Sequence, residues 1–365
     1  MLRAGIVTVL FATALTLPAR TARPEVSIIH STDLCHPHGD PDDHYDLACL
    51  FALKEFDIKG IVLDLGEEQA VRPGRLAVEQ MMHITGRQVP CAVGLSKPLP
   101  SGEDQALDEA KQFQGGVELV LTVLRRAGDK VVLHTGGSCR DVAAAFNRQP
   151  ELFRTKVKAI YIDAGYGPEG EQDECNVNFS PAAFLRLLQS GLPVYWCPCF
   201  GHDGYQTFYV AQQPTVLAGC AAAVQNYFVY CLTKSKAEPI AFLASGAHPL
   251  PGGERQMWCT GALLHAACRK IYQRGKDDFV ALSPQEAGKA GLADKAVEVY
   301  RFVPARVAVE RPSEPKKVDR RPQWPRLRTE LNPPQANCFV FRVTDPRYGK
   351  VMASCLKNLL SELGR

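Results

Sequence analysis

The chain has 365 residues, of which 46% are hydrophobic, and this is enough to build a large α/β domain with a substantial core. Its 42 basic and 39 acidic residues nearly balance. The charge therefore favours neither nucleic acid nor an anionic membrane as a partner. We expect local chemistry to carry the function, with a small molecule as partner, and the composition leaves a homo-oligomer open.

The first residues are typical of a signal peptide. Arg3 precedes an apolar stretch, residues 5–19, which is too short to span a bilayer comfortably, and the small residues Ala19 and Ala22 offer a cleavage site. The alternatives are a buried first strand and a membrane anchor. We expect residues 1–23 to be removed, so that the mature chain is exported to the periplasm or the extracellular space without a membrane segment.

The main body of the chain, residues 24–310, alternates short β-branched runs with longer helical patterns. This alternation predicts βαβ units and a Rossmann-like α/β fold, with a mostly parallel open sheet flanked by helices. Ligands bind such sheets in the loops at the carboxyl ends of the strands. The predicted strands are Val26–His30, Ile58–Leu65, Lys130–Thr135, Val157–Ile162 and Pro193–Cys197. The predicted helices lie at about 42–55, 73–86, 115–127, 140–147, 180–190, 216–232 and 255–273.

The last part of the chain begins with residues 311–336, which are rich in proline and basic residues with little periodicity. This pattern predicts a surface connection. Cys338–Val343 is expected to form a strand and Val351–Leu363 a helix, so that residues 337–365 pack on the same domain. The chain also has 13 cysteines, scattered and odd in number, which favour neither a zinc ribbon nor a small disulfide framework.

Four carboxylates crowd the loop between the first strand and its helix: Asp33, Asp40, Asp42 and Asp43. Like charges this close repel unless a cation neutralises them, and hard oxygen ligands select Ca²⁺ or Mg²⁺. The alternative is a helix N-terminus enriched in aspartate, which explains one or two of the four. We therefore expect a divalent cation at this loop.

Histidines in the same loop allow a different metal. His36, His38 and His44, together with Cys35, suit zinc. A His-x-His pair is a weak signal, however, and loop histidines are often simply solvated. The carboxylates favour Ca²⁺, or Mg²⁺, over zinc.

The first strand, the aspartate loop and the helix resemble the inosine/uridine-preferring nucleoside hydrolases, whose first strand ends in a D-x-D-P-G-x-D-D motif. Asp33 is similar to the early aspartate of that motif and Asp42 and Asp43 to its closing pair, with residues 35–40 inserted between them. The resemblance implies the fold of that family and an N-glycosyl hydrolase activity. It also implies that Asp33 and Asp43 act in catalysis, that Asp33, Asp40 and Asp43 bind Ca²⁺, and that Asp42 holds the ribose hydroxyls.

Two further segments carry the resemblance. Residues 134–141 are similar to the family's G-P-L-T-N turn, which implies a metal-binding carbonyl near Cys139. Residues 174–181, with the sequence E-C-N-V-N-F-S-P, are similar to the family's E-F-N-x-x-x-D-P. Glu174 and Asn176 are two apart, so in an extended segment both face one way and can share a sugar's hydroxyls, with Asn178 beside them. The alternative is an ordinary surface loop.

The sequence departs from the family at a late helix, where the family has a His-Asp pair and this chain has Trp258 and Cys259. A neutral thiol is a poor Ca²⁺ ligand. Help for the leaving group must then come from elsewhere, and we name His202 as the candidate. The alternatives are Asp203, His248, Glu254 and Arg255. Trp258 is expected either to stack on a base or sugar face or to pack in the core.

Three functions fit these residues. The favoured one is hydrolysis of the N-glycosidic bond of a ribonucleoside or related riboside by a Ca²⁺-activated water. The second is hydrolysis of another glycoside, with residues 35–40 reshaping the pocket. The third is a non-catalytic protein that binds a sugar or nucleoside on the same fold.

Overall fold

The structure is a computed structural model that describes residues 26–312 and 324–364. The expected signal peptide lies outside the described residues, so cleavage and export stay predictions. Among the helices that are described, none combines the length and the apolar character needed to cross a membrane. All 13 cysteines fall within the described ranges, and most of them are buried.

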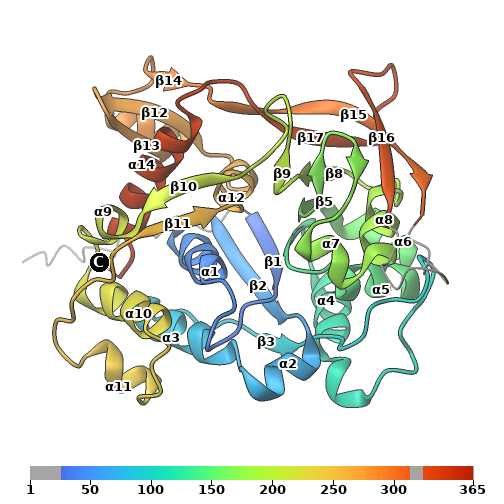
Figure 1. The fold of residues 1–365 in the computed structure, drawn as a ribbon, viewed down its shortest axis with the longest axis horizontal. Coiled ribbons are helices and arrows are strands. Elements are labelled where there is room, and N and C mark those ends of the chain that lie inside the picture. The colour runs from blue at the N-terminus through green and yellow to red at the C-terminus, as the bar shows by residue number, and fades with distance from the viewer. Residues whose placement is uncertain (1–25, 313–323, 365) are drawn as a thin grey trace, which may run out of the picture.

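A large sheet runs through the middle of the molecule (Figure 1). Its parallel part contains the expected strands, and the antiparallel part is added at one edge. In the described residues its strands, in the order of pairing, are β3 (Cys91–Val93), β2 (Phe56–Leu63), β1 (Val26–Thr32), β4 (Val131–Gly136), β5 (Val157–Asp163), β8 (Val194–Cys197), β17 (Cys338–Val343), β15 (Tyr300–Arg311), β16 (Arg326–Leu331) and β7 (Gly170–Glu171). The prediction of a mostly parallel sheet is confirmed.

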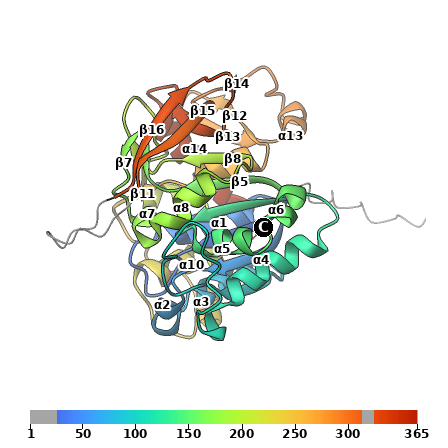
Figure 2. The same cartoon turned by 90° about the vertical axis from the view of Figure 1, so that its right-hand side faces the viewer.

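Helices cover both faces of this sheet because its central strands are apolar on both sides. Ile28 and Ile29, neighbours in β1, belong to two different hydrophobic clusters, as they must when successive side chains point to opposite faces. Helices α1, α3, α10, α12 and α14 contribute to one cluster, and α4, α5, α6 and α8 to the other (Figures 1 and 2).

The helices have the following bounds: α1 (Asp42–Ala52), α2 (Gly66–Val71), α3 (Arg75–Thr85), α4 (Gly115–Arg126), α5 (Arg140–Arg148), α6 (Pro150–Lys156), α7 (Cys175–Phe179), α8 (Pro181–Leu188), α9 (Gln213–Leu217), α10 (Ala222–Leu232), α11 (Pro239–Leu243), α12 (Thr260–Ala266), α13 (Pro284–Lys289) and α14 (Tyr348–Ser361), with a 3₁₀ turn, η1 (Lys111–Phe113). The expected helices of the first half are therefore found within a few residues of their predicted bounds.

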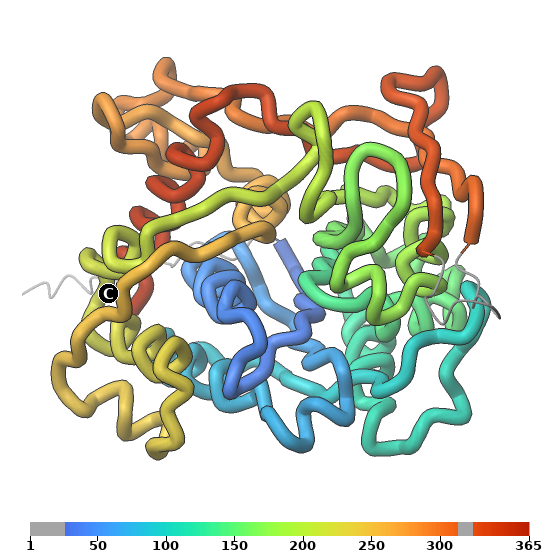
Figure 3. The backbone as a smooth tube through the Cα atoms, viewed as in Figure 1, coloured from blue at the N-terminus to red at the C-terminus, as the bar shows by residue number. Residues whose placement is uncertain are grey.

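The described residues also form three small sheets outside the large one. They pair β10 (Tyr209–Gln212) with β11 (Glu254–Met257), β12 (Lys270–Gly275) with β13 (Asp278–Leu282) and β14 (Ala296–Val297), and β6 (Tyr166–Gly167) with β9 (Phe200–Gly201). The tube in Figure 3 shows the end of the chain returning beside α9 and α10, where α14 packs on α9 and β10. The C-terminal strand and helix predicted from the sequence are both present, as β17 and α14.

The single helix predicted over 255–273 is wrong, because three elements occupy that range: β11, α12 and β12. The apolar spacing is real, but α12 stops where Cys268 takes a left-handed conformation with φ 56°. The backbone N–H of Arg269 then donates to the carbonyl of Leu264, which closes the helix in the manner of a Schellman cap. Ile271 is buried in a strand instead of on a helix face.

The surface connection predicted for residues 311–336 is wrong for Arg326–Leu331, which form β16 and pair with β15. Residues 313–323 lie outside the described part. β16 alternates a buried Leu327 with exposed charged residues, and its edge pairs only with the short β7. A strand with mostly polar side chains is easily taken for a loop, because its two isolated leucines, Leu327 and Leu331, do not establish an alternation.

His265, at the end of α12, makes the stability of the fold depend on pH. Its Nδ1 lies 2.8 Å from the hydroxyl of Tyr161, and burial lowers the pKa of His265 from 6.5 to about 4. The neutral imidazole is preferred in the folded state, so this contribution is complete above pH 6.5 and is lost as the pH falls toward 4. The wild type should lose unfolding free energy as the pH falls from 7 to 4. We expect this loss to be about 2–3 kcal/mol smaller in His265→Gln.

Urea unfolding at a series of pH values measures this difference. The exposed His83 provides the matched control, and His83→Gln is expected to leave the wild-type pH profile unchanged. Equal profiles for His265→Gln and the wild type would show that the buried histidine is not coupled to folding.

Candidate active site

A cavity of about 560 Å³ lies at the carboxyl ends of β1, β4, β5 and β8. This is the edge of the sheet at which a parallel α/β fold binds ligands. The predicted site residues that line it are Asp33, Asp40, Asp42, Asp43, Glu174, Asn176 and Trp258. The aspartate loop and the Glu174 segment, which are distant in sequence, thus face one common space.

Three predicted site residues are not among those that line the cavity. Asn178 is exposed, and its amide donates to Asp173. His202 is about half exposed, and its Nδ1 lies 3.1 Å from Oδ2 of Asp203. The carbonyl of Cys139 accepts the backbone N–H of Ala143 in the first turn of α5. The roles assigned to these residues stay predictions.

The aspartates are held in the strand-to-helix connection by local bonding. Asp33 follows β1, while Asp42 and Asp43 form the first turn of α1, where carboxylates suit the exposed N–H groups. Asp43 accepts a 2.6 Å hydrogen bond from the hydroxyl of Thr32, the last residue of β1. Asp40 is about half exposed and lies 3.8 Å from Arg255.

Burial and mutual repulsion disfavour the charged forms of these acids. The pKa of Asp33 is raised to about 7, chiefly by burial and then by Asp64. The pKa values of Asp42 and Asp43 are raised well above their usual range, again chiefly by burial, with neighbouring carboxylates adding to the effect. A positive ion among them would reverse this penalty.

The cavity acids therefore fit a hard divalent cation in donor type and charge. The other two groups that the family resemblance suggests fit less well, since the Cys139 carbonyl is engaged in α5 and position 259 offers a thiol. Among the described residues, Asp33, Asp40 and Asp43 do not bring three oxygens within 4.8 Å of one another. The three aspartates line the cavity, but their carboxylate oxygens do not converge on one common position.

The loop histidines pack against α10 and its neighbourhood. His36 stacks on Tyr230 with ring centroids 4.6 Å apart, and its Nε2 lies 2.8 Å from the carbonyl of Ser235. The ring centroids of His36 and His38 lie 6.3 and 6.1 Å from that of His44. In the described chain, these residues and Cys35 form no group of metal-ligand atoms within 4.8 Å.

Glu174 and Asn176 reach the cavity in a different way from the extended segment that we expected. Glu174 caps the short helix α7, and its carboxylate accepts backbone N–H groups from Gly165, Asn176 and Val177 at 2.8–3.2 Å. Asn176 lies in α7 and donates its amide to the carbonyl of Asp163 at 2.9 Å. Both side chains are thus fixed in position while they line the cavity.

Aromatic rings form another wall. Trp258 lies 5.8 Å from Phe200 and 5.7 Å from Phe208 between ring centroids, and both Trp258 and Phe200 line the cavity. The indole N–H of Trp258 is buried and has no hydrogen-bond partner in the part of the chain that is described. An unpaired donor on an aromatic wall is suited to a ring that carries acceptors.

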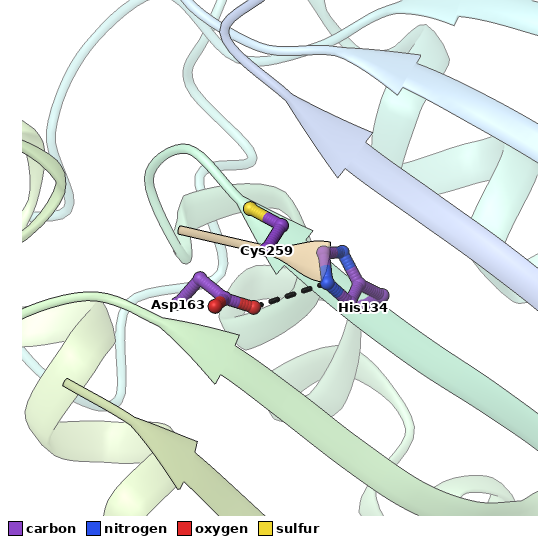
Figure 4. Close-up of side chains that lie close together, drawn as sticks. All are labelled: His134, Asp163 and Cys259. Carbon is purple, nitrogen blue, oxygen red and sulfur yellow. Dashed lines mark ion pairs between the residues drawn. The ribbon is translucent and has the colours of Figure 1, made fainter. Parts of the chain in front are cut away.

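Sequence reasoning missed a buried polar cluster beside this cavity. Asp163 and Cys259 line the cavity, His134 lies next to them (Figure 4), and His30 contacts His134 from the neighbouring strand. His134 Nε2 lies 3.0 Å from Asp163 Oδ2, and the Nδ1 atoms of His30 and His134 are 2.9 Å apart. Burial lowers the pKa of His134 to about 3 and raises that of Asp163 well above its usual range. The signal was available, since each of the two histidines interrupts an otherwise apolar or small-residue strand.

No family model matches the sequence. Pyrimidine-specific ribonucleoside hydrolases from Escherichia coli and Salmonella paratyphi B are similar to it, with 29% and 30% identity over 172 residues. The match covers 42% of this chain and 55% of either relative, so the chain spans about half the length of the curated relatives it matches.

Two solved structures share the fold over nearly the whole chain. A purine-preferring ribonucleoside hydrolase from Gardnerella vaginalis superposes with a TM-score of 0.56 at 15% identity, covering 92% of this chain and 99% of its own. A plant nucleoside hydrolase gives 0.54 at 15% identity, covering 93% and 99%. The chain is therefore similar in sequence to ribonucleoside hydrolases over part of its length, and it shares the fold of the nucleoside hydrolases over nearly all of it.

Proposed function

We propose that the protein hydrolyses the N-glycosidic bond of a ribonucleoside or a related riboside. The observation that carries this proposal is the shared cavity, which brings the aspartate loop, Glu174 and Asn176 together at one sheet edge. Acids on one side and a carboxylate–amide pair on the other provide the acceptors and donors that bind vicinal hydroxyls.

The chain's own residues divide the work. Asp33, Asp40 and Asp43 would hold Ca²⁺ or Mg²⁺, which lowers the pKa of a bound water. Asp43, fixed by Thr32, is placed to accept a proton from the attacking water, with Asp33 as its neighbour. Asp42, Glu174 and Asn176 bind the sugar hydroxyls, and Trp258 offers its face and its free N–H to the base.

One observation favours a second candidate function, a non-catalytic nucleoside or sugar binder. Within the described residues, no histidine lines the cavity, so an imidazole acid for the leaving group is missing from its wall. Substrates whose leaving group needs no protonation separate the two functions, because a site with an activated water but no acid still cleaves them.

The test combines turnover with binding. The purified chain is mixed with inosine, uridine and p-nitrophenyl riboside in CaCl₂, MgCl₂ or EDTA, and released reducing sugar is measured. We expect sugar release with a divalent cation and none in EDTA, with p-nitrophenyl riboside cleaved fastest. Calorimetric binding of a riboside without release from any substrate would contradict hydrolysis and support the binder.

Trp258→Ala is expected to raise KM for a nucleoside about tenfold and to change kcat much less, because stacking holds the base in the ground state as well as in the transition state. Steady-state kinetics on a cleaved nucleoside measure this. Trp258→Phe keeps an aromatic face and should restore most of the lost affinity. If the alanine variant keeps the wild-type KM, then Trp258 serves only to pack the wall with Phe200 and Phe208.

A further inference from the structure

The sheet face beside the cavity carries polar side chains where it is otherwise apolar. His30 and His134 lie side by side on the paired strands β1 and β4, and Asp163 ends β5. Residues two positions before them on the same strands, Ile28 and Val132, belong to the hydrophobic cluster of that face. Polar groups at such places are costly to bury unless they are paired.

Cys259 lies close to these groups, on the neighbouring helix α12. It stands at the N-terminal end of α12, is 4% exposed, and lines the cavity together with Asp163 and Gly136. Its Sγ packs over Gly136, where a side-chain Cβ would lie 3.3 Å from the sulfur. The glycine thus leaves room for the thiol to approach the sheet face that carries His134.

Three donors of different kinds converge there. A ligand atom from each of His134, Asp163 and Cys259 lies within 4.8 Å of the other two, and in the described chain these residues are the one group of metal-binding side chains that does so (Figure 4). All three side chains are buried. A zinc ion with bonds of about 2.0–2.3 Å to nitrogen, oxygen and sulfur fits between atoms spaced in this way.

The donors are also unsatisfied without an ion. Although His134 Nε2 and Asp163 Oδ2 are 3.0 Å apart, their alignment is not that of a hydrogen bond. Among the described residues, neither His134 Nε2 nor either oxygen of Asp163 has a hydrogen-bond partner. Buried polar atoms are rarely left in this condition, so the geometry indicates a group that is bound there.

A supporting shell fixes the orientation of these donors. His30 and His134 share one proton between their Nδ1 atoms at 2.9 Å, which orients the His134 ring with Nε2 toward Asp163. The carboxyl group of Asp46, in α1, is hydrogen-bonded to the Cys259 thiol. Partners of this kind position histidine and cysteine ligands in metal sites.

We propose that His134, Asp163 and Cys259 bind a thiophilic divalent ion, of which zinc is the natural example, with one coordination position open to the cavity. A carboxylate and a thiolate neutralise the two charges of the ion, so the buried site carries no net charge. Binding breaks the S–H bond of Cys259, forms a metal–sulfur bond and releases the proton to solvent. This site is separate from the aspartate-loop cation, and it stands whether or not the protein cleaves ribosides.

Cobalt(II) and zinc(II) test the site directly. Chelator-treated, reduced protein is titrated with Co²⁺, and we expect one equivalent to give a thiolate-to-cobalt charge-transfer absorption with strong visible bands of four-coordinate geometry. Zn²⁺ should displace the cobalt at one equivalent. Cys259→Ser should abolish the charge-transfer band, and Asp163→Asn should weaken Zn²⁺ binding at least about 100-fold. His30→Gln, which removes only the supporting contact, should weaken it about 10–100-fold.

Two variants serve as controls. Cys175→Ser removes an exposed cysteine that also lines the cavity, and it should keep the full cobalt spectrum. Asp43→Asn should keep the spectrum too, even if it loses its response to Ca²⁺, so the two sites can fail independently. Circular dichroism checks that Cys259→Ser is folded, and Cys259→Ala provides a second variant. A cobalt spectrum without charge transfer, or one that is equal in the wild type and both Cys259 variants, overturns the proposal in favour of a metal-free hydrogen-bonded cluster.

Discussion

Replacing Asp43 with asparagine is expected to lower kcat/KM for a cleaved riboside by about 10³-fold or more while it stabilises the cation-free protein. The asparagine side chain keeps the size of the carboxylate, and its amide oxygen can still accept the hydrogen bond from the hydroxyl of Thr32. It cannot take a proton from water or neutralise a cation. The activity loss therefore reports the chemistry of one oxygen and not a collapse of the loop.

The stability effect follows from the sign of the pKa shift. Burial and neighbouring acids raise the pKa of Asp43 in the folded protein above its unfolded value of 3.8. The folded state thus binds the proton more tightly, and this group's contribution falls as the pH rises through the folded pKa. In EDTA at pH 7, Asp43→Asn removes that penalty, and we expect a higher thermal midpoint than in the wild type.

Thermal unfolding with and without CaCl₂ completes the experiment. Calcium should raise the midpoint of the wild type and have a smaller effect on Asp43→Asn. Asp129→Asn, at an exposed position outside the cavity, should match the wild type in turnover and in both midpoints. Unchanged turnover in Asp43→Asn would show that Asp43 does not act in catalysis. A lower thermal midpoint in EDTA would show that burial of its carboxylate does not destabilise the cation-free protein.

The early βα units were predictable from the sequence because local patterns define them. The run before Asp33 carries apolar side chains on both faces, with Ile28 on one and Ile29 on the other, as expected of a strand covered by helices, and the acids after it mark the carboxyl edge. Several strands of the second half of the chain were not predictable in the same way. β16 and the β12–β13 hairpin depend on pairing with distant partners, and their own side chains alternate too weakly to show a period.

The same difference separates the site residues that the sequence predicts from those that it does not predict. Asp42, Asp43 and Glu174 were found because several polar residues cluster within one short segment. His134 and Asp163 are single polar residues on separate strands, and only the register of β1, β4 and β5 brings them next to His30 and to each other. A buried histidine within an apolar run is a usable signal, but it names neither its partner nor its ligand.

Replacing Arg140 with methionine is expected to cost about 3–5 kcal/mol of unfolding free energy, because it leaves the buried carboxylate of Asp64 without its counter-charge. Arg140 is 2% exposed, lies 3.5 Å from Asp64, and donates to the carbonyls of Ser96 and Phe179. Phe179 lines the cavity, so one guanidinium ties the loop after β2 to the segment that carries Asn176.

A double-mutant cycle separates the charge from the packing. Arg140→Met combined with Asp64→Asn should recover a large part of the loss, since no unpaired charge remains buried. The surface pair of Arg154 and Glu151 supplies the comparison, and Arg154→Met should cost less than about 1 kcal/mol in urea unfolding. If Arg140→Met and Arg154→Met cost the same, the buried pair does not hold the cavity loops. If the double variant is no more stable than Arg140→Met, the lost carbonyl contacts dominate instead of the charge.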